Sequence, residues 1–318
     1  MKCHEIIKDR NRVINVAVTV DNNYIKPLIV MLTSLFYNNR ENNFTIYLIH
    51  SDLTDENIGK VSDLIRKYSQ RIFVIKLAST LFEKATSVAH VTKETFYRLL
   101  LTEIIPQEVD KILYLDPDII INGSISQLYD KKFHNRLAIA AEVAKDNSRW
   151  DSPKKLIGIP KKAVYFNAGV MLFNLKLMRK SPIFSKEFML DYVVKNNSRF
   201  IEGDQSCLNA LLWDKIIILN CNLYNYDTRF CFDKEKQSFM KYFISDIRDE
   251  KIAYQKSLII HYRGASKPWN SDYYGKLWYL YWYYENMTEY KRSFLINYLH
   301  HKYSNMKEYM SMIKKKYL

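Results

Sequence analysis

The chain is poor in glycine, proline and cysteine, with seven, seven and four of them among its 318 residues. So few glycines and prolines exclude a collagen-like or low-complexity chain and argue against long flexible linkers. The cysteine spacings fit neither a CxxC metal pair nor a disulfide framework. We therefore expect reduced thiols in a cytoplasmic setting, and we assign no role to Cys207, Cys221 or Cys231.

The sequence also lacks a hydrophobic run long enough to cross a bilayer, for which about 20 apolar residues are needed. Residues 1–12 are polar and contain no apolar core of a secretory signal. Acidic residues are in deficit, because 34 aspartates and glutamates face 48 lysines and arginines, and the formal charge is +14. Such a charge favours nucleic acid, an anionic lipid surface or a phosphorylated substrate. No known nucleic-acid-binding module is recognisable, so we expect no nucleic-acid partner.

Hydrophobic periodicity predicts an α/β chain. Alternating strands and helices with short connections are typical of a parallel sheet. In the first part of the chain, β-branched runs predict strands and helical spacing predicts helices over 13–20, 24–37, 44–50, 54–68 and 72–77, in alternation. Further along we expect a helix over 95–101 and strands over 111–115, 137–141, 164–166, 170–174, 216–219 and 257–261.

No repeat or flexible linker interrupts this pattern, so we expect one α/β domain over residues 1–270. Residues 271–318 differ in composition, since they hold 11 of the 25 tyrosines and have Lys314, Lys315 and Lys316 near their end. The pattern predicts a helical C-terminal segment with interleaved aromatic and basic residues. One hypothesis is that the segment contacts an anionic membrane. The alternative is that residues 273–284 pack onto the domain and only the final lysines are solvated.

Two aspartates, Asp116 and Asp118, directly follow the strand predicted over 111–115. Ligands of open α/β sheets bind at the carboxyl ends of strands, so the pair lies at a suitable edge. Pro117 stiffens the turn, and both carboxylates can face one divalent cation whose other ligands are phosphate or water oxygens. The alternative is an ordinary turn in which Asp118 caps a loop.

A second candidate group follows the strand predicted over 257–261. His261 can complete a site of two carboxylates and one imidazole, which suits Mn²⁺ better than Mg²⁺ because imidazole is the softer ligand. Gly264 permits a diphosphate to approach the backbone closely, and Lys267 offers it a positive charge. A surface histidine on a loop is the alternative.

Six short motifs occur in a characteristic order, at residues 21–24, 95–99, 114–118, 165–170, 203–205 and 261–269. In this order they resemble glycosyltransferase family 8, the retaining GT-A enzymes that include bacterial lipopolysaccharide galactosyl- and glucosyltransferases. The resemblance extends from about Asn15 to Trp269. It implies a Rossmann-like GT-A fold with a mainly parallel central sheet. It also implies a retaining hexosyltransferase that takes its sugar from UDP-glucose or UDP-galactose.

The resemblance assigns roles to residues within these motifs. It implies that Asp116, Asp118 and His261 bind Mn²⁺, with Mg²⁺ as the alternative ion. Asp204 and Gln205 match the family's position for the transferred hexose and its disputed nucleophile. The donor-binding residues that the resemblance implies are Asp21, Asn23, Arg98, Asn167, Gly264 and Lys267.

His90 and Arg263 match positions where members of the family face the acceptor. The implied acceptor is a glycan or a lipid-linked glycan, which would bring a cytoplasmic enzyme to the inner face of the cell membrane. Two other functions stay open on the residues alone: a non-catalytic nucleotide-sugar-binding protein, and a phosphatase of the haloacid dehalogenase type. That phosphatase class has its DxD on the first strand, with Thr or Val where this chain has Ile120.

Overall fold

The computed structural model describes residues 12–83, 93–144, 148–228, 257–270, 273 and 277–291. Its first part is a βαβαβ unit in which each strand pairs in parallel with the next along the chain. This unit consists of β1 (Val13–Thr19), α1 (Ile25–Tyr37), β2 (Asn43–His50), α2 (Asp55–Lys67) and β3 (Arg71–Lys76). The parallel α/β pattern predicted for this region is therefore confirmed.

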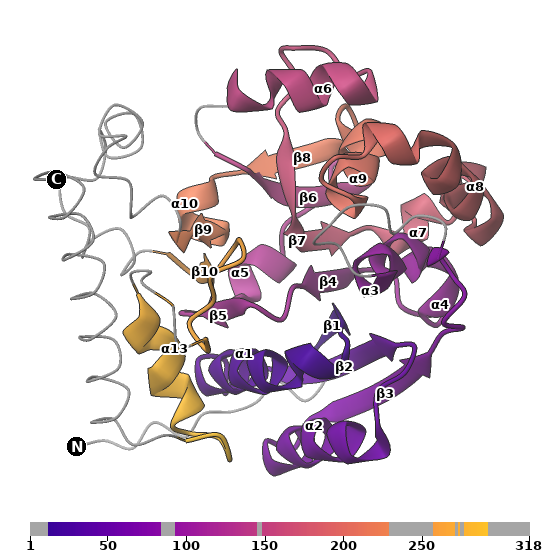
Figure 1. Ribbon diagram of the computed structural model, residues 1–318. Helices are drawn as coiled ribbons and strands as arrows, with labels where there is room; N and C mark the ends of the chain where they lie inside the picture. The colour runs from indigo at the N-terminus through magenta and orange to yellow at the C-terminus, as the bar shows by residue number, and fades with distance from the viewer. Residues whose placement is uncertain are drawn as a thin grey trace, which may run out of the picture.

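The central sheet has seven strands in the order β3-β2-β1-β4-β7-β6-β8, which fan across the molecule in Figure 1. The remaining strands are β4 (Ile112–Leu115), β6 (Ala138–Glu142), β7 (Phe166–Phe173) and β8 (Ile216–Leu219). β7 runs antiparallel to both of its neighbours, while the other pairs are parallel. The sheet is thus mainly parallel, as the sequence predicts.

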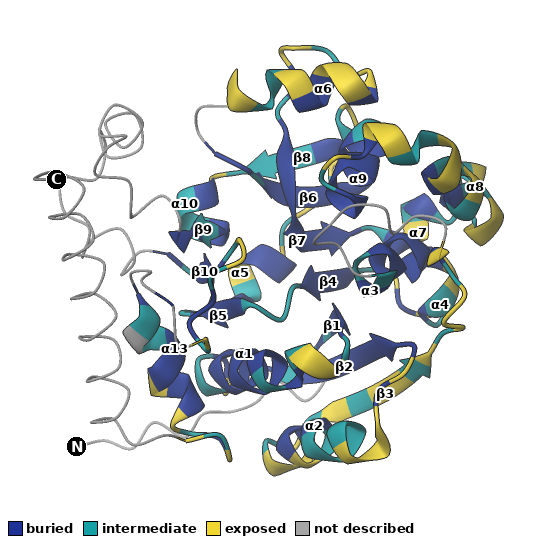
Figure 2. Ribbon diagram, viewed as in Figure 1, coloured by how far each residue is buried: buried dark blue, intermediate teal, exposed yellow. Residues whose placement is uncertain are grey.

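Alternate residues of the central strands face opposite sides of the sheet, as the period of two in a strand requires. In β4, Ile112 and Tyr114 belong to one hydrophobic cluster, and Leu113 and Leu115 belong to another. Both clusters are closed off by helices, so β1, β4 and β7 are buried on both faces (Figure 2). This double burial explains why these strands are continuous apolar runs.

Short helices and turns connect the strands that follow β3. Between β3 and β4 lies a helical stretch made of α3 (Lys93–Phe96), a 3₁₀ turn (Tyr97–Leu100) and α4 (Leu101–Ile104), where one helix was predicted. The other helices are α5 (Ser126–Tyr129), α6 (Asp151–Ile157), α7 (Leu175–Met178), α8 (Lys186–Asn196), α9 (Asp204–Leu212) and α10 (Cys221–Tyr224). The separate strands predicted over 164–166 and 170–174 are wrong, since β7 is one continuous strand.

A second, three-stranded sheet lies beside the first and has the order β5-β10-β9. Its strands are β5 (Ile119–Ile121), β9 (Tyr226–Asp227) and β10 (Ile259–His261). β5 begins directly after Asp118, so the chain passes from the main sheet into the second one through the Asp116–Asp118 turn. This small sheet fixes the position of the functional site.

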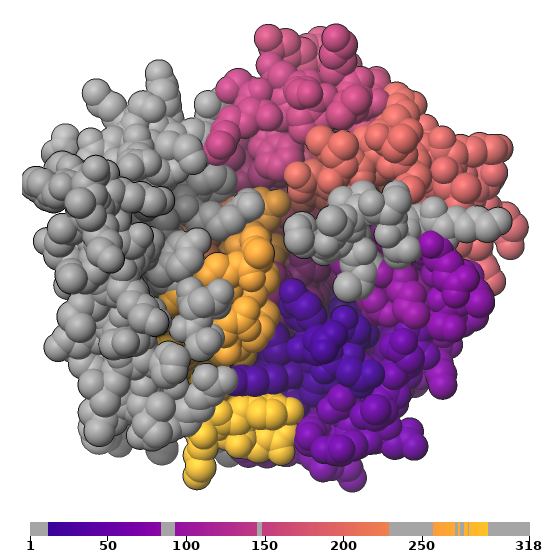
Figure 3. Space-filling model, viewed as in Figure 1, coloured from indigo at the N-terminus to yellow at the C-terminus, as the bar shows by residue number. Residues whose placement is uncertain are grey.

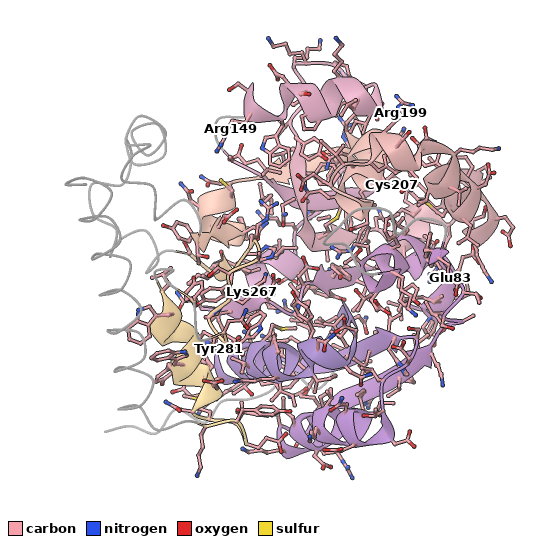
Figure 4. All side chains as sticks on the ribbon, in the orientation of Figure 1. Glu83, Arg149, Arg199, Cys207, Lys267 and Tyr281 are labelled. Carbon is pink, nitrogen blue, oxygen red and sulfur yellow. The ribbon has the colours of Figure 1, made fainter. Side chains whose placement is uncertain are left out.

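The described part of the C-terminal segment packs onto the domain. Its helix α13 (Trp278–Glu285) lies against α1 in Figure 1, and Tyr281 is labelled beside α1 in Figure 4. Glu285 is fully buried and forms an ion pair with Lys26 of α1. Four aromatic residues of the segment are also buried, namely Tyr273, Tyr281, Trp282 and Tyr284.

The packing alternative is therefore correct for these four residues, but Tyr283 of the same range is 48% exposed. Lys314, Lys315 and Lys316 lie outside the described residues. Within the described ranges, no helix combines the length and the apolar character needed to span a bilayer.

Candidate functional site

Strand pairing brings the two halves of the predicted metal site together. Asp116 and Asp118 lie between β4 and β5, and His261 is the last residue of β10. β10 runs antiparallel to β5 with His261 opposite Ile119, and the Tyr262 amide donates to the carbonyl oxygen of Asp118 over 3.0 Å. The histidine is thus held directly alongside the aspartate turn.

The side chains of this group converge on one point. One ligand atom from each of Asp116, Asp118 and His261 lies within 4.8 Å of the other two. Nε2 of His261 is 3.0 Å from Oδ1 of Asp118 and 3.8 Å from Oδ2 of Asp116. Gly169 of β7 lies against the same point, since a Cβ at this position would come within 2.4 Å of Oδ2 of Asp116. The backbone therefore leaves room for the carboxylates only because residue 169 is glycine.

A buried arginine joins the metal-site carboxylates to the predicted sugar site. The guanidinium of Arg98 lies 2.9 Å from Oδ1 of Asp116 and 2.9 Å from Oδ2 of Asp204. It also donates to the carbonyl oxygen of Ala168 over 2.7 Å and covers the ring of Tyr114. Burial acts to lower the pKa of Arg98, but the two carboxylates outweigh it and the pKa is raised. This side chain is thus a permanent cation.

Asp204 has the electrostatics of a group that can exchange a proton near neutral pH. It is the first residue of α9 and is almost fully buried. Burial raises the pKa of Asp204 to about 6, and Asp116 adds to the rise although Arg98 opposes it. A shifted carboxyl in a polar cluster is a feature of functional sites.

Lys267 lies on the opposite side of the aspartate pair. Its Nζ is 2.5 Å from Oδ2 of Asp118, and it also donates to the carbonyl oxygen of Tyr262 over 2.7 Å. Burial acts to raise the pKa of Asp118, but its interactions with Lys267 and His261 outweigh burial and hold the pKa well below its usual range. In Figure 4 the label of Lys267 lies between the second sheet and α1.

A pocket opens above these residues at the carboxyl ends of β1 and β4. Its lining includes Asp21, Tyr24, Arg98, Asp116 and Asp118, with Thr19, Val20, Glu94, Thr95, Tyr114 and Pro117. In Figure 3 the orange atoms of residues 257–270 lie beside the indigo N-terminal segment around a hollow at the centre of this face. The pocket thus joins the first βα turn to the aspartate pair.

Two aromatic residues of the site were missed as functional residues by the sequence analysis. Tyr24 lines the pocket, and its ring meets that of Trp269 edge to face, with centroids 5.8 Å apart. The hydroxyl of Tyr114 donates to Oδ1 of Asp116 over 3.0 Å and lies 2.8 Å from the hydroxyl of Thr19. A tyrosine inside an apolar strand needs a polar partner, and this need was the available signal for Tyr114.

Other predicted residues have more local surroundings. Asp21 caps the turn at the start of α1 by accepting from the amides of Asn23 and Tyr24, and it also lines the pocket. Asn23 is exposed and does not line the pocket, so its donor role stays a prediction. Gly264 follows β10 with a φ of 89°, a conformation that favours glycine. Arg263 pairs with Asp227 at 3.1 Å.

His90 and Cys231 lie outside the described residues. Cys207 and Cys221 are buried free thiols, in agreement with the absence of a role for them. Asn167 and Gln205 do meet, since Nδ2 of Asn167 donates to Oε1 of Gln205 over 2.7 Å. These two predicted site residues are therefore in direct contact.

The donor set fits a hard divalent cation. Three carboxylates (Asp116, Asp118 and Asp204) face two cationic side chains (Arg98 and Lys267), which leaves negative charge in a largely buried cluster. A cation bound by two carboxylates and one imidazole would offset that charge and attract a diphosphate. An aspartate pair that only caps a loop does not explain this convergence.

The fold and the site together define a GT-A glycosyltransferase, which takes a nucleotide sugar as donor and a glycan as acceptor. The chain matches Glycosyl transferase family 8 over residues 15–273, and it belongs to that family. The phosphatase and non-catalytic alternatives are thereby excluded, because the chain is an enzyme of the glycosyltransferase class.

The chain is also similar to curated proteins and to solved structures. A lipopolysaccharide 1,2-glucosyltransferase of Escherichia coli is 29% identical over 270 residues, covering 82% of this chain and 75% of the relative. The general stress protein A of Bacillus subtilis (strain 168) is 24% identical over 265 residues, covering 83% and 90%. The galactosyltransferase LgtC, solved with donor and acceptor sugar analogues, superposes with a TM-score of 0.73 at 22% identity and covers 87% and 96%.

Proposed function

We propose that this chain is a Mn²⁺-dependent, retaining hexosyltransferase that moves glucose or galactose from a UDP-sugar to a saccharide or lipid-linked glycan. The observation that carries the proposal is the convergence of Asp116, Asp118 and His261 beside two buried cationic side chains. When bound, the cation would offset the charge that builds on the diphosphate as the glycosidic bond breaks.

Residues of the chain itself are assigned to binding the diphosphate and the uridine and to positioning the carboxylates. Lys267 lies at Asp118 and is placed to receive a phosphate oxygen of the leaving diphosphate. Asp21 and Tyr24 line the pocket just after β1 and are assigned to the uridine. Arg98 holds Asp116 and Asp204 together, so it sets the distance between the metal side and the sugar side of the site.

Gln205 is already occupied as a hydrogen-bond acceptor. Its Oε1 accepts from Nδ2 of Asn167 over 2.7 Å and from the backbone amide of Ala168 over 3.2 Å. A carbonyl oxygen has two acceptor positions, and both are in use. This arrangement favours direct attack by the acceptor hydroxyl, on the face that the diphosphate leaves, over a covalent adduct on Gln205.

The acceptor class is inferred from the relatives. Several of them are lipopolysaccharide glucosyl- or galactosyltransferases, so we place this chain in the synthesis of a cell-surface polysaccharide.

A screen of sugar nucleotides tests the donor. UDP release is followed by mass spectrometry in the presence of Mn²⁺ and in the presence of EDTA. We expect Mn²⁺-dependent release from UDP-glucose or UDP-galactose. Release that is insensitive to EDTA, or none from any UDP-sugar, would contradict the proposal.

We also propose peripheral contact with the inner face of the cell membrane, carried by charge. Tyr281, Trp282 and Tyr284 of α13 are buried against the domain, so the basic residues near the C-terminal end of the sequence are the better candidate. Basic residues near an anionic surface contribute about 1 kcal/mol each.

A charge-reversal experiment tests this contact. Liposome flotation is measured for wild type and for the combined variant Lys314→Glu, Lys315→Glu and Lys316→Glu. The matched control reverses three other lysines whose side chains are 85, 67 and 71% exposed: Lys161, Lys176 and Lys195. We expect only the C-terminal variant to lose flotation. Equal loss in both variants would show that flotation depends on net charge and not on Lys314, Lys315 and Lys316, and would contradict the proposal.

A further inference from the structure

A chain of buried side-chain amides runs from His261 into the sugar side of the site. Nδ1 of His261 lies 2.9 Å from Oδ1 of Asn225, and Nδ2 of Asn225 lies 2.6 Å from Oδ1 of Asn167. Asn167 in turn contacts Gln205 at 2.7 Å. Each of these four residues is at most 6% exposed, so the chain is shielded from bulk water. Asn225 is the member that the sequence analysis did not find.

Two backbone amides determine which group donates and which accepts in every hydrogen bond between these four side chains. A backbone amide can only donate, and the amides of Ala168 and Gly169 donate to Oε1 of Gln205 and Oδ1 of Asn167 respectively. Both side-chain oxygens are thereby fixed as acceptors.

The fixed oxygens determine the orientation of Asn225. Because Oδ1 of Asn167 is an acceptor, Asn225 must turn its Nδ2 toward it, and its own Oδ1 then faces His261. An amide oxygen only accepts, so Nδ1 of His261 must carry a proton. The other ring nitrogen, Nε2, is the one that points at Asp116 and Asp118.

Secondary structure keeps Asn225 in this place. It lies directly before β9, and β9 pairs in parallel with β10, with Asp227 opposite His261. Its backbone amide also donates to the carbonyl oxygen of Cys221 over 2.9 Å at the end of α10. The backbone is thus held on both sides of Asn225.

We propose that Asn225 is a positioning residue of the metal centre. By accepting the Nδ1 proton it orients the His261 ring and directs Nε2 to the cation. Its second hydrogen bond, through Asn167, ties that ring to Gln205 on the sugar side. The inference rests on the proposed cation site of Asp116, Asp118 and His261.

The test is a titration of the full-length chain with Mn²⁺ alone, with free Mn²⁺ followed by electron paramagnetic resonance. Asn225→Leu removes the acceptor at similar volume, and we expect the Kd to rise by about 10- to 100-fold. Asn225→Asp keeps an acceptor for Nδ1 but loses the donor to Oδ1 of Asn167, so its Kd should rise clearly less than that of Asn225→Leu. A purely structural role predicts the opposite order, because the aspartate variant buries an added charge.

Two further measurements separate this role from general damage. Asn220→Ala removes the side-chain cap of α10 without touching the amide chain, and its Kd should match wild type. In a His261→Ala background, Asn225→Leu should cause no additional loss of Mn²⁺ affinity, because the two residues act through one ligand. This cycle decides the question even if Asn225→Asp does not fold.

Three results would overturn the role of Asn225. They are an unchanged Kd in Asn225→Leu, a Kd for Asn225→Asp as weak as that of Asn225→Leu, and losses for His261→Ala and Asn225→Leu that multiply. If wild type itself binds no Mn²⁺, the proposed cation site falls and the role of Asn225 falls with it. That outcome differs from the first three, in which wild type binds the ion.

Discussion

The substitution Gly169→Ala tests how tightly the metal site is built into the sheet. Gly169 lies within β7, where its carbonyl oxygen accepts from the amide of Asp116 over 2.8 Å. An added Cβ would lie 2.4 Å from Oδ2 of Asp116 and 2.5 Å from Cε1 of His261. The backbone conformation is ordinary for alanine, so the effect comes from the methyl group alone.

The size of the effect follows from these two contacts. Ordinary contacts between carbon and its neighbours are about 3.5 Å, so both side chains must retreat by about 1 Å. Neither retreats freely, because Asp116 is held by Arg98 and Tyr114 and His261 is held by Asn225. A displacement of about 1 Å costs on the order of 10²-fold in rate, and overpacking costs about 1–3 kcal/mol of stability.

The assay is Mn²⁺-dependent UDP release, with urea unfolding measured on the same preparation. The matched control is Gly59→Ala in α2, where a Cβ meets nothing within 4 Å. That control should keep full activity and gain about 0.5–1 kcal/mol, because alanine favours a helix. Activity of Gly169→Ala within about threefold of wild type would refute the reasoning, since a site that tolerates a shift of about 1 Å is not preorganised.

Three further predictions follow from charged residues. Burial raises the pKa of Asp204 to about 6 from 3.8, so the folded state binds this proton more tightly and stability falls as pH rises between these values. The side chain in Asp204→Asn does not titrate, so the free energy of unfolding of this variant should rise relative to that of wild type by up to about 3 kcal/mol from pH 4 to pH 7. Urea unfolding measures this difference, and a difference that does not change with pH would contradict the prediction. Lys26→Met removes the cation beside the buried Glu285 and should cost about 2–3 kcal/mol, of which Glu285→Leu in the same chain recovers most. Lys267→Met should weaken UDP binding by about tenfold or more in calorimetry, and unchanged affinity would remove Lys267 from the diphosphate site.

The sequence predicts the first half of the fold well because its elements are long and regular. β1 and β2 are β-branched runs that end in polar turns, and α1 and α2 have clear helical spacing. The second sheet was not predicted beyond the strand ending at His261, because β5 and β9 have three and two residues, too few for a period to be recognised.

β7 was predicted as two strands for a related reason. Asn167 and the two small residues after it interrupt the apolar run and resemble a turn. In the structure Asn167 stays in the strand because Gln205 and Asn225 satisfy its polar atoms. These partners come from α9 and from the residue before β9, and no local pattern reveals them.

The site itself was predicted through motif order more than through local chemistry. Asp116 and Asp118 form a visible pair, but their meeting with His261 depends on the pairing of β5 with β10. Arg98 was predicted as a donor-site residue, but its ion pairs with Asp116 and Asp204 were not predicted. They form only because the helical stretch 93–104 packs beside these aspartates. Asn225 carries no sequence signal, since an asparagine between two tyrosines is equally typical of a surface turn.

The most direct test of the cation site is anomalous diffraction from crystals grown with Mn²⁺ and UDP. The geometry predicts one strong peak per chain, within bonding distance of carboxylate oxygens of Asp116 and Asp118 and of Nε2 of His261, with the UDP diphosphate on the same ion. A peak that excludes His261, a bond through Nδ1, or UDP bound without any ion at the aspartate pair would contradict the account.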